Sequence, residues 1–350
     1  MRIAQIAPLH EAVPPRLYGG TERIVSYLTE GLVARGHEVT LFASADTQTT
    51  ARLVPVRERA LRFDPRPLKS GYAAHLSMLD EVRRQADAFD ILHFHIDLVH
   101  FPFFEARAGR TVTTLHGRLD LTDLAEAYAR WAEYPLVSIS DAQRRFLPDA
   151  NWLRTVHHGV PADLFRLSLG AGGYLAFLGR ISPEKRPDRA IAVAARTGMP
   201  LKIAAKIDPA DQAYWDEIIA PLIAAHANVA FIGEIGDADK SAFLGGAAAL
   251  LFPIDWPEPF GLVMIEALGC GTPVIAWRNG SVAEIIEDGV TGYVVSSEDE
   301  AVAAVAALGR LDRAAIRRAF EQRFSTGIMT AAYEDLFKGL LRGEAVTQAA

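Results

Sequence analysis

The chain has 350 residues, which suggests two domains of about 150–200 residues each rather than one. Half of the residues are apolar and 23% are charged, so the composition excludes disordered, collagen-like and coiled-coil chains. The net charge of −7 argues against a nucleic-acid-binding protein, because such proteins normally carry a clustered excess of basic residues.

Cysteine usage and the start of the sequence bear on the cellular compartment. Cys270 is the single cysteine and cannot form an intramolecular disulfide, which fits a reducing compartment. The first residues run directly into a strand pattern, without the basic and then apolar layout of a signal peptide. Apolar stretches stay below the roughly 18 residues that a membrane-spanning helix needs. We therefore expect a cytoplasmic protein.

In the first half of the chain, short apolar runs alternate with longer amphipathic segments, which is typical of strand–helix units around a parallel sheet. The first helix is expected over residues 21–35, with Thr21 as its N-cap and Gly36 as its C-terminal stop. The strands of this half are expected at residues 2–7, 38–42, 91–95, 111–115, 136–139 and 153–157.

A glycine-rich segment without periodicity separates this half from a second series of strand–helix units. We place a first domain over residues 1–168, a second over residues 169–324, and a C-terminal helix over residues 325–350 that returns toward the first domain. The expected fold class is α/β, with two doubly wound Rossmann-like domains facing each other across a cleft that holds the ligands. The strands of the second domain are expected at residues 174–178, 201–205, 229–232, 249–252, 273–276 and 292–295.

The most informative segment follows the expected strand at residues 249–252. Pro259 and Gly261 mark a strand-to-helix junction there, so the amides of Leu262 and Val263 are expected to point outward without partners. A helix N-terminus of this kind binds anions through its free N–H groups and its positive dipole end. The junction therefore predicts a phosphate-binding position.

Two carboxylates flank this junction, Glu258 in the loop and Glu266 inside the helix. A carboxylate can accept hydrogen bonds from two vicinal hydroxyls, so acids beside a phosphate cradle indicate a sugar nucleotide. The helix is otherwise apolar and a buried glutamate is rare without a partner, so we interpret Glu266 as a ligand-binding residue. The alternative is a buried glutamate that is held by a structural partner.

A second cluster lies at the end of the expected strand 174–178. Gly179 is expected to clear space at the strand tip, and Arg180 and Lys185 are expected in the following loop. Two cations at this position can neutralise a diphosphate leaving group as its negative charge develops. The alternative is that both are solvated surface charges.

A glycine pair, Gly19 and Gly20, stands at the start of the first helix. Glycines there allow backbone amides to approach a phosphate, although many strand–helix turns contain glycine for its conformational freedom alone. The dinucleotide pattern Gly-x-Gly-x-x-Gly is absent at this turn, which disfavours a nicotinamide dehydrogenase.

With these clusters in this order, the chain resembles the family-4 retaining glycosyltransferases of GT-B fold over residues 3–337. The most specific signal is the Glu-x7-Glu spacing of Glu258 and Glu266 within the Pro-Phe-Gly and Cys-Gly-Thr-Pro-Val context. The resemblance implies that Glu266 grips the nucleotide ribose and that Glu258 contacts hydroxyls of the donor sugar. It also implies that Arg180 and Lys185 clamp the diphosphate.

The resemblance implies further contacts in both domains. His116 matches a histidine that the family places beside the donor sugar, and Gly20 would close over the diphosphate. The base would lie near residues 232–235, mostly against backbone. The catalytic set is then Arg180, Lys185, Glu258 and His116, and the donor-binding set is Gly19, Gly20, Gly179, Ile235, Phe260, Gly261, Leu262, Val263 and Glu266.

The function implied is transfer of a hexose from a nucleotide sugar, UDP-linked, to a hydroxyl acceptor with retention of anomeric configuration. The acceptor is not identified by the sequence and would lie against the first domain, and domain closure around the donor would precede transfer. A phosphate oxygen would take the acceptor proton, and no metal or other cofactor is expected. The alternatives are a sugar-nucleotide epimerase on the same two-domain frame and a catalytically silent binding protein.

The sequence departs from the family pattern at three places. Residues 280–284 read Gly-Ser-Val-Ala-Glu instead of Gly-Gly-x-Pro-Glu, residues 157–159 read His-His-Gly instead of Pro-Asn-Gly, and Trp256 precedes the motif as a further candidate for the donor-sugar pocket.

Three other signals have competing interpretations. Asp237 and Asp239 are interpreted as helix-capping residues rather than metal ligands, and His93 and His95 share a strand face without a third ligand at zinc spacing. The basic run at residues 52–69 is interpreted as a solvated loop on the acceptor side, with contact to an anionic membrane as the alternative.

Overall fold

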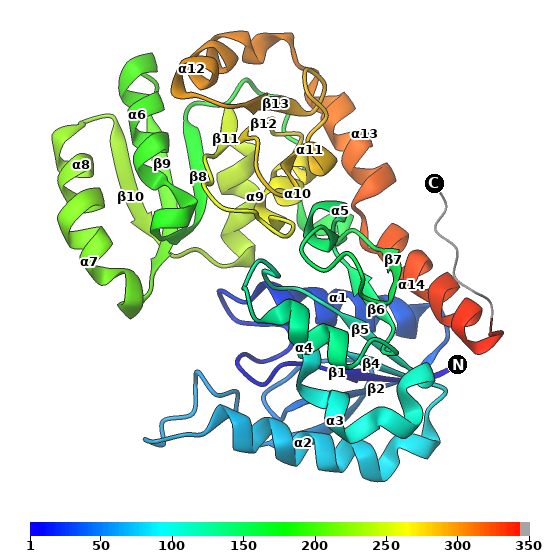
Figure 1. The fold of residues 1–350 in the computed structure, drawn as a ribbon. Helices are drawn as coiled ribbons and strands as arrows, with labels where there is room; N and C mark the ends of the chain where they lie inside the picture. The colour runs from blue at the N-terminus through cyan, green and yellow to red at the C-terminus, as the bar shows by residue number, and fades with distance from the viewer. Residues whose placement is uncertain (344–350) are drawn as a thin grey trace. The chain divides into compact units, whose positions relative to one another are not determined.

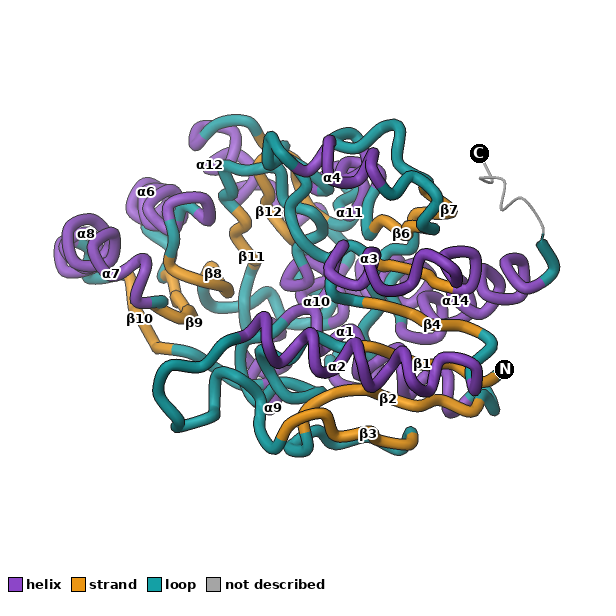
Figure 2. Tube along the Cα trace, turned by 60° about the horizontal axis from the view of Figure 1, so that its bottom comes forward, coloured by secondary structure: helices purple, strands orange, loops and turns teal. Residues whose placement is uncertain are grey.

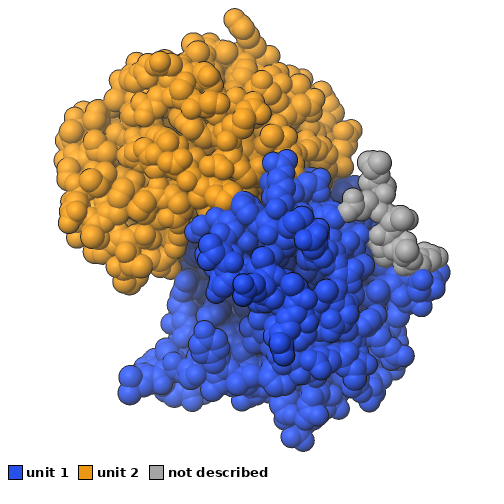
Figure 3. All heavy atoms as spheres, viewed as in Figure 1, with its two compact units in different colours: residues 1–159, 326–350 blue, residues 160–325 orange. Residues whose placement is uncertain are grey.

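The computed structural model describes residues 1–343 and divides the chain into two compact units. Unit 1 comprises Met1–Gly159 together with the chain from Thr326 onward, and unit 2 comprises Val160–Ser325 (Figure 3). Each unit has its own parallel sheet and its own hydrophobic core.

The first unit ends before residue 168, where the sequence analysis places the boundary. The aperiodic segment after Gly159 belongs to unit 2 because polar contacts hold it there. Arg317 donates hydrogen bonds to the carbonyl oxygens of Ala162 and Phe165, and the amide of Ser168 donates to the carbonyl oxygen of Cys270 at 3.0 Å. These contacts have no periodic signature in the sequence.

Within the described residues, unit 1 contains a seven-stranded parallel sheet in the order β3-β2-β1-β4-β5-β6-β7. Helices α1 and α14 lie side by side on one face of this sheet, and α2 and α3 cover the other face (Figure 1, Figure 2). The strands are β1 (Arg2–Ile6), β2 (Glu38–Ser44), β3 (Arg52–Arg57), β4 (Ile91–Phe94), β5 (Thr111–Thr114), β6 (Leu136–Ser138) and β7 (Trp152–Thr155). The helices are α1 (Gly20–Ala34), α2 (Gly71–Gln85), α3 (Phe101–Phe104), α4 (Leu124–Arg130), α5 (Asp141–Arg144) and α14 (Thr326–Leu341).

The start of α1 differs from the prediction. The helix begins at Gly20, with Gly19 as its N-cap at φ 149°, so the prediction of Thr21 as N-cap is wrong. Glycine adopts this positive φ without the steric penalty that other residues meet, which lets the chain enter the helix earlier. The predicted stop at Gly36 is confirmed by its φ of 82° directly after the C-cap.

The basic run at residues 52–69 is not a loop throughout, because its first part forms the edge strand β3. Pro55 is tolerated there since an edge strand leaves one side without ladder hydrogen bonds. Arg57 and Arg66 both contact the buried carboxylate of Asp64 at 2.6 Å, and Arg62 forms an ion pair with Glu11. Much of the positive charge is therefore neutralised within the unit.

Helix α14 corresponds to the helix expected over residues 325–350, of which residues 344–350 lie outside the described part of the chain. It packs on α1 and buries Met329, Tyr333 and Phe337. The Tyr333 hydroxyl lies 2.8 Å from Thr114 Oγ1 on β5, so α14 is part of unit 1.

In the described chain, unit 2 contains a six-stranded parallel sheet in the order β10-β9-β8-β11-β12-β13. The strands are β8 (Leu175–Ile181), β9 (Leu201–Ile207), β10 (Val229–Gly233), β11 (Ala249–Phe252), β12 (Val274–Trp277) and β13 (Gly292–Val295). The helices are α6 (Pro187–Thr197), α7 (Gln212–Tyr214), α8 (Ala220–Ala225), α9 (Asp237–Gly245), α10 (Leu262–Gly269), α11 (Val282–Ile285), α12 (Glu298–Ala307) and α13 (Arg313–Arg323). Among residues 1–343, none of the helices combines the length and the apolar character needed to cross a bilayer.

Candidate functional site

The strand order of unit 2 reverses between β8 and β11, because β9 and β10 extend the sheet on one side and β12 and β13 on the other. In open parallel sheets, ligands bind beyond the carboxyl ends of the strands at such a reversal. The segment after β8 carries Lys185, and the loop after β11 carries Trp256 and Glu258. Two of the three sequence clusters therefore meet where the topology favours a ligand.

Strand β8 is longer than expected, so Gly179 and Arg180 lie within it rather than at its tip and in the following loop. The strand continues because Gly179 and Arg180 pair in register with Ala205 and Lys206 of β9. A Cβ at position 179 would meet no atom within 4 Å, so the space directly beside this glycine is open.

Lys185, Glu258 and Trp256 form a compact polar cluster. Lys185 ends the short helical turn η5 (Pro183–Lys185), and its ammonium forms an ion pair with Glu258 Oε2. The indole N–H of Trp256 donates a hydrogen bond to the same oxygen at 3.0 Å, and the Lys185 Nζ lies 4.8 Å from the Trp256 ring centroid. Glu258 is buried, and these two donors satisfy its Oε2.

The loop at residues 280–284, which departs from the family pattern, packs against the backbone of Glu258. Gly280 has φ 53°, and a Cβ at this position would lie 2.3 Å from the backbone oxygen of Glu258. The amide of Ser281 donates to that same oxygen at 3.0 Å, and the Ser281 hydroxyl donates to the carbonyl oxygen of Phe260 at 2.8 Å. Glycine and serine at these two positions thus fix the backbone on either side of Pro259.

Helix α10 begins directly after this segment. Its N-cap is Gly261, at φ 83° and ψ 69°, and no side chain caps the helix. A Cβ on Gly261 would lie 2.8 Å from Met264 Cε and 2.9 Å from Phe252 Cζ, so the tight entry requires glycine. Leu262 and Val263 are the first two residues of the helix, whose N–H groups have no acceptor within the helix.

Glu266, one turn into α10, is held by a lysine that the sequence analysis missed. Lys240 on α9 places its Nζ 2.8 Å from Glu266 Oε1 and 3.3 Å from Asp237 Oδ1. Within residues 1–343, the other oxygen, Oε2, is buried and has no hydrogen-bond partner. The structural-partner alternative thus accounts for one oxygen of Glu266 and leaves the second available to a ligand donor.

Lys240 could have been sought from the rule that a buried glutamate needs a partner. No local pattern points to it, because it lies 26 residues away on a different helix. The prediction that Asp237 or Asp239 caps this helix is wrong, since the N-cap of α9 is Gly236. Both aspartates lie in its first turn, where their charge is favourable to the helix dipole.

Arg180 lies among three carboxylates. It forms an ion pair with Glu184, and its guanidinium nitrogens are 3.7 Å from Asp208 Oδ2 and 3.8 Å from Asp211 Oδ2. An anionic ligand at this guanidinium would compete with these acids. Lys185 is thus paired with Glu258, whereas Arg180 is surrounded by three other carboxylates.

The candidate residues of unit 1 lie beyond β1, β4 and β5. Gly20 is exposed at the start of α1, and a Cβ on Gly19 would lie 2.8 Å from Pro15 Cβ. His116 follows β5, with its Nε2 2.8 Å from His95 Nδ1, and His95 Nε2 lies 2.7 Å from Gln5 Oε1. Burial lowers the pKa of His116 to about 3, so this imidazole is neutral at physiological pH.

His93 and His95 are buried hydrogen-bonding residues. His93 lies on β4 and His95 directly follows its last residue; their ring centroids are 4.1 Å apart, and His93 Nε2 lies 2.8 Å from Thr114 Oγ1. Across residues 1–343, no cluster of three or more His, Cys, Asp or Glu side chains is arranged to hold a metal ion.

Comparison with known proteins identifies the family. The model described as "Glycosyltransferase Family 4" matches residues 18–166, and the model described as "Glycosyl transferases group 1" matches residues 171–318. A curated relative, phosphatidyl-myo-inositol mannosyltransferase of Mycobacterium leprae, is 26% identical over 91% of this chain and 90% of its own length.

Solved structures share the fold over nearly the whole chain. AviGT4, a glycosyltransferase involved in avilamycin A biosynthesis, is 25% identical with a TM-score of 0.70, covering 98% of both chains. Anabaena HepE in complex with UDP-glucose is 18% identical with a TM-score of 0.75, covering 97% of this chain and 100% of its own. With its two parallel α/β sheets and matches to both family models, the chain belongs to the family-4 glycosyltransferases of GT-B fold.

Proposed function

We propose that this glycosyltransferase moves a hexose from a UDP-linked sugar to a hydroxyl acceptor, with retention of configuration and without a metal ion. The observation that carries the proposal is the Lys185–Glu258–Trp256 cluster, at the reversal of strand order in unit 2. A lysine and a buried glutamate that lie together there can bind two different groups of one ligand, the lysine an anionic group and the glutamate hydroxyl groups. The structural similarity to HepE, which was solved in complex with UDP-glucose, supports the choice of donor.

In the proposed mechanism, donor binding exchanges the partners within this cluster. Lys185 leaves Glu258 and contacts oxygens of the diphosphate, while Glu258 accepts hydrogen bonds from hydroxyls of the sugar. The Leu262 and Val263 amides add donors at the helix N-terminus. This exchange keeps Glu258 satisfied and places positive charge where the leaving group becomes negative.

Glu266 is proposed to bind the ribose through its unpartnered Oε2, with Lys240 holding Oε1. During transfer, the acceptor oxygen bonds to the anomeric carbon as the bond to the phosphate oxygen breaks. The acceptor proton passes to a phosphate oxygen, so no protein nucleophile is needed. The roles of Arg180, Gly19, Gly20 and His116 stay predictions.

A panel of UDP-, GDP- and ADP-linked sugars, scored by thermal shift with and without EDTA, tests the donor. We expect a UDP-linked hexose to raise the Tm most, and EDTA to leave the shift unchanged. An acceptor screen with that donor follows, and NMR of the product should show the donor's anomeric configuration. A product formed from the donor alone would indicate an epimerase, and the absence of any nucleotide shift would overturn the proposal.

A further inference from the structure

Arg186 directly follows Lys185 and has an unusual backbone conformation. Its φ and ψ are both 51°, in the left-handed region, and it forms the N-cap of α6. A residue with a Cβ is uncommon there and persists only where its surroundings hold it. The contacts of its guanidinium group show what holds it.

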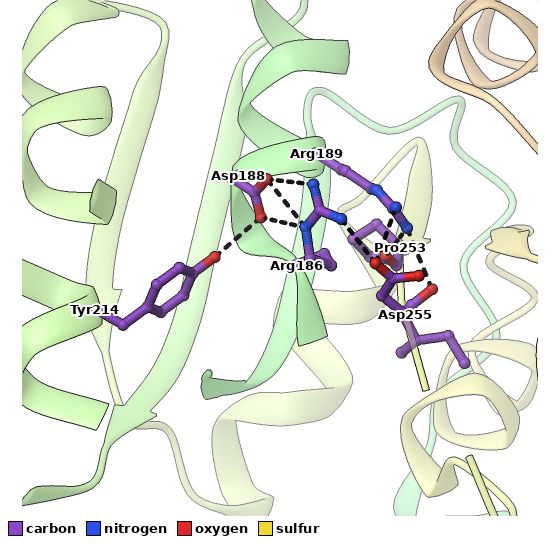
Figure 4. A network of polar contacts seen from close by, with 7 residues as sticks. Arg186, Asp188, Arg189, Tyr214, Pro253 and Asp255 are labelled. Carbon is purple, nitrogen blue, oxygen red and sulfur yellow. Dashed lines mark hydrogen bonds and ion pairs between the residues drawn. The ribbon is translucent and has the colours of Figure 1, made fainter. Parts of the chain in front are cut away.

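The guanidinium of Arg186 bridges two aspartates on different segments (Figure 4). Its Nη2 donates to Asp188 Oδ2 at 2.8 Å within α6, and its Nη1 donates to Asp255 Oδ2 at 2.9 Å in the loop after β11. Asp188 is fixed in turn by the Tyr214 hydroxyl at 2.9 Å. Burial favours the neutral form of Asp188, but the hydrogen bonds from Arg186 and Tyr214 outweigh it and hold the pKa of this carboxyl below its usual value.

Asp255, three residues before Glu258 in the chain, contacts the segment that carries Lys185. Its amide donates to the carbonyl oxygen of Glu184 at 2.8 Å, and its carboxylate also accepts from Arg189 Nη2 at 3.2 Å. The bridge from Arg186 to Asp255 therefore joins the residue after Lys185 to the loop that presents Glu258. Both ends of the cluster are tied to the same pair of side chains.

These arginines do not resemble an open anion site. Arg186, Arg189 and Arg196 line a cavity of about 440 Å³ beside Trp277, but each is paired with a carboxylate. Asp299, which also lines the cavity, accepts from Arg196 at 2.5 Å. Because each arginine is paired with a carboxylate, these arginines link segments of the chain to one another.

We infer that the Arg186–Asp255 bridge is a positioning device that sets Lys185 against the leaving group and Glu258 against the sugar. This inference rests on the proposed function of that cluster. Neither residue of the bridge needs to touch the substrate. Its effect should appear in turnover and should pass entirely through Lys185 and Glu258.

The test uses Arg186→Gly, because glycine keeps the left-handed backbone while the guanidinium is removed. We expect kcat to fall roughly 10- to 100-fold, as for a misplacement of about 1 Å, with a much smaller change in KM for the donor. Asp255→Ala removes the side-chain acceptor of the bridge and should give the same effect on kcat and KM, which covers the case in which one variant folds poorly. The matched control is Arg196→Ala, which breaks another Arg–Asp pair of α6 and should stay within about twofold.

A second arm separates positioning from general support. In a Lys185→Ala background, adding Arg186→Gly should lower single-turnover rates by a clearly smaller factor than in the otherwise wild-type protein, because one of the two positioned groups is already gone. Equal losses in both backgrounds, or wild-type kcat in Arg186→Gly, would overturn the inference while leaving the proposed function intact. A wild-type protein that neither binds nor turns over any nucleotide sugar would instead overturn the proposed function, and the inference with it.

Discussion

Glu258 and Glu266 are both buried, but their carboxylates are satisfied in different ways. One oxygen of Glu258 receives Lys185 and Trp256 together, whereas Glu266 gives one oxygen to Lys240 and, in the described chain, keeps the other without a partner. A ligand can add a donor to Glu266 without displacing anything. At Glu258 a ligand meets one oxygen, Oε2, that Lys185 and Trp256 already occupy. The two acids should therefore differ in their mutational effects.

Glu266→Gln should weaken nucleotide binding more than it lowers turnover. The change removes the charged acceptor proposed for the ribose, and a hydrogen bond to a charged group contributes about 1.5–3 kcal/mol, or roughly 10- to 150-fold in Kd. Calorimetry with UDP measures this, with Glu217→Gln, an exposed glutamate of unit 2 outside the proposed site, as control. An unchanged Kd for UDP at an unchanged Tm would remove the ribose assignment.

Lys185→Ala should lower turnover more than it weakens binding of the donor. Loss of one donor aimed at developing negative charge typically lowers kcat roughly 10²- to 10³-fold. We expect a fall of that size in steady-state turnover, with a smaller rise in KM for the donor. Lys202→Ala, which removes a lysine lying 3.9 Å from the Tyr174 ring centroid, provides the control. Equal turnover in the two variants would contradict the role given to Lys185.

At the scale of elements, the proposed site residues lie in loops and at helix ends, and the sheet of unit 2 fixes where these segments begin. The loop containing Gly280 approaches the backbone of Glu258 so closely that a single methyl group would not fit. Position 289 has a similar positive φ of 74°, but a Cβ there meets nothing within 4 Å. Substitutions at positions 280 and 289 can therefore distinguish the effect of backbone strain, which both share, from the effect of a contact with Glu258, which only position 280 has.

Gly289→Ala should be destabilised by about 1–2 kcal/mol, because alanine is strained in the left-handed region, and Gly280→Ala should be destabilised by more, because its Cβ also meets the backbone of Glu258. Only Gly280→Ala should also lose transfer activity, by about tenfold or more, since its methyl group pushes on the segment that presents Glu258. Thermal melts and initial rates on both variants check this. Equal activity in the two would show that Gly280 does not position Glu258.

The pairing of α14 with α1 should make stability depend on pH. Hydrogen bonds from Lys338 and Arg35 lower the pKa of Glu334 to about 2, from an unperturbed 4.5. Because the folded-state pKa is depressed, this stabilisation is full above pH 4.5 and is lost as the pH falls toward 2. The Tm difference between wild type and Glu334→Gln should therefore be largest near neutral pH and shrink below about pH 4. A difference independent of pH would contradict the pairing.

At the scale of the whole molecule, the alternation of strands and helices predicted the α/β class and most of the strands. The strand at Gly292–Val295 was predicted to the residue. Strand β3 was missed because its charged, proline-containing sequence lies at an exposed edge. The unit boundary and Lys240 were missed for a shared reason, since both depend on side-chain contacts between segments distant in the sequence. The clustered motifs predicted that Lys185 and Glu258 act on one ligand, but not that they contact each other or that Arg180 has separate acidic neighbours.

Phe337→Ala tests whether α14 belongs energetically to unit 1. Phe337 is fully buried and packs on His93, so its truncation should cost about 3–5 kcal/mol in the unfolding of that unit. UDP binding should persist at temperatures below the lowered transition, because the proposed nucleotide contacts lie in unit 2. Calorimetry with and without UDP measures both effects. Loss of UDP binding while unit 1 stays folded would contradict this division of labour.

The central claim is that Lys185, Glu258 and Glu266 act on one molecule of nucleotide sugar. A crystal structure of the complex with UDP-glucose measures this most directly. The account predicts Lys185 Nζ within hydrogen-bond distance of the diphosphate, sugar hydroxyls on Glu258 and a ribose hydroxyl on Glu266 Oε2. A nucleotide bound elsewhere, with the Lys185–Glu258 ion pair still closed, would contradict it.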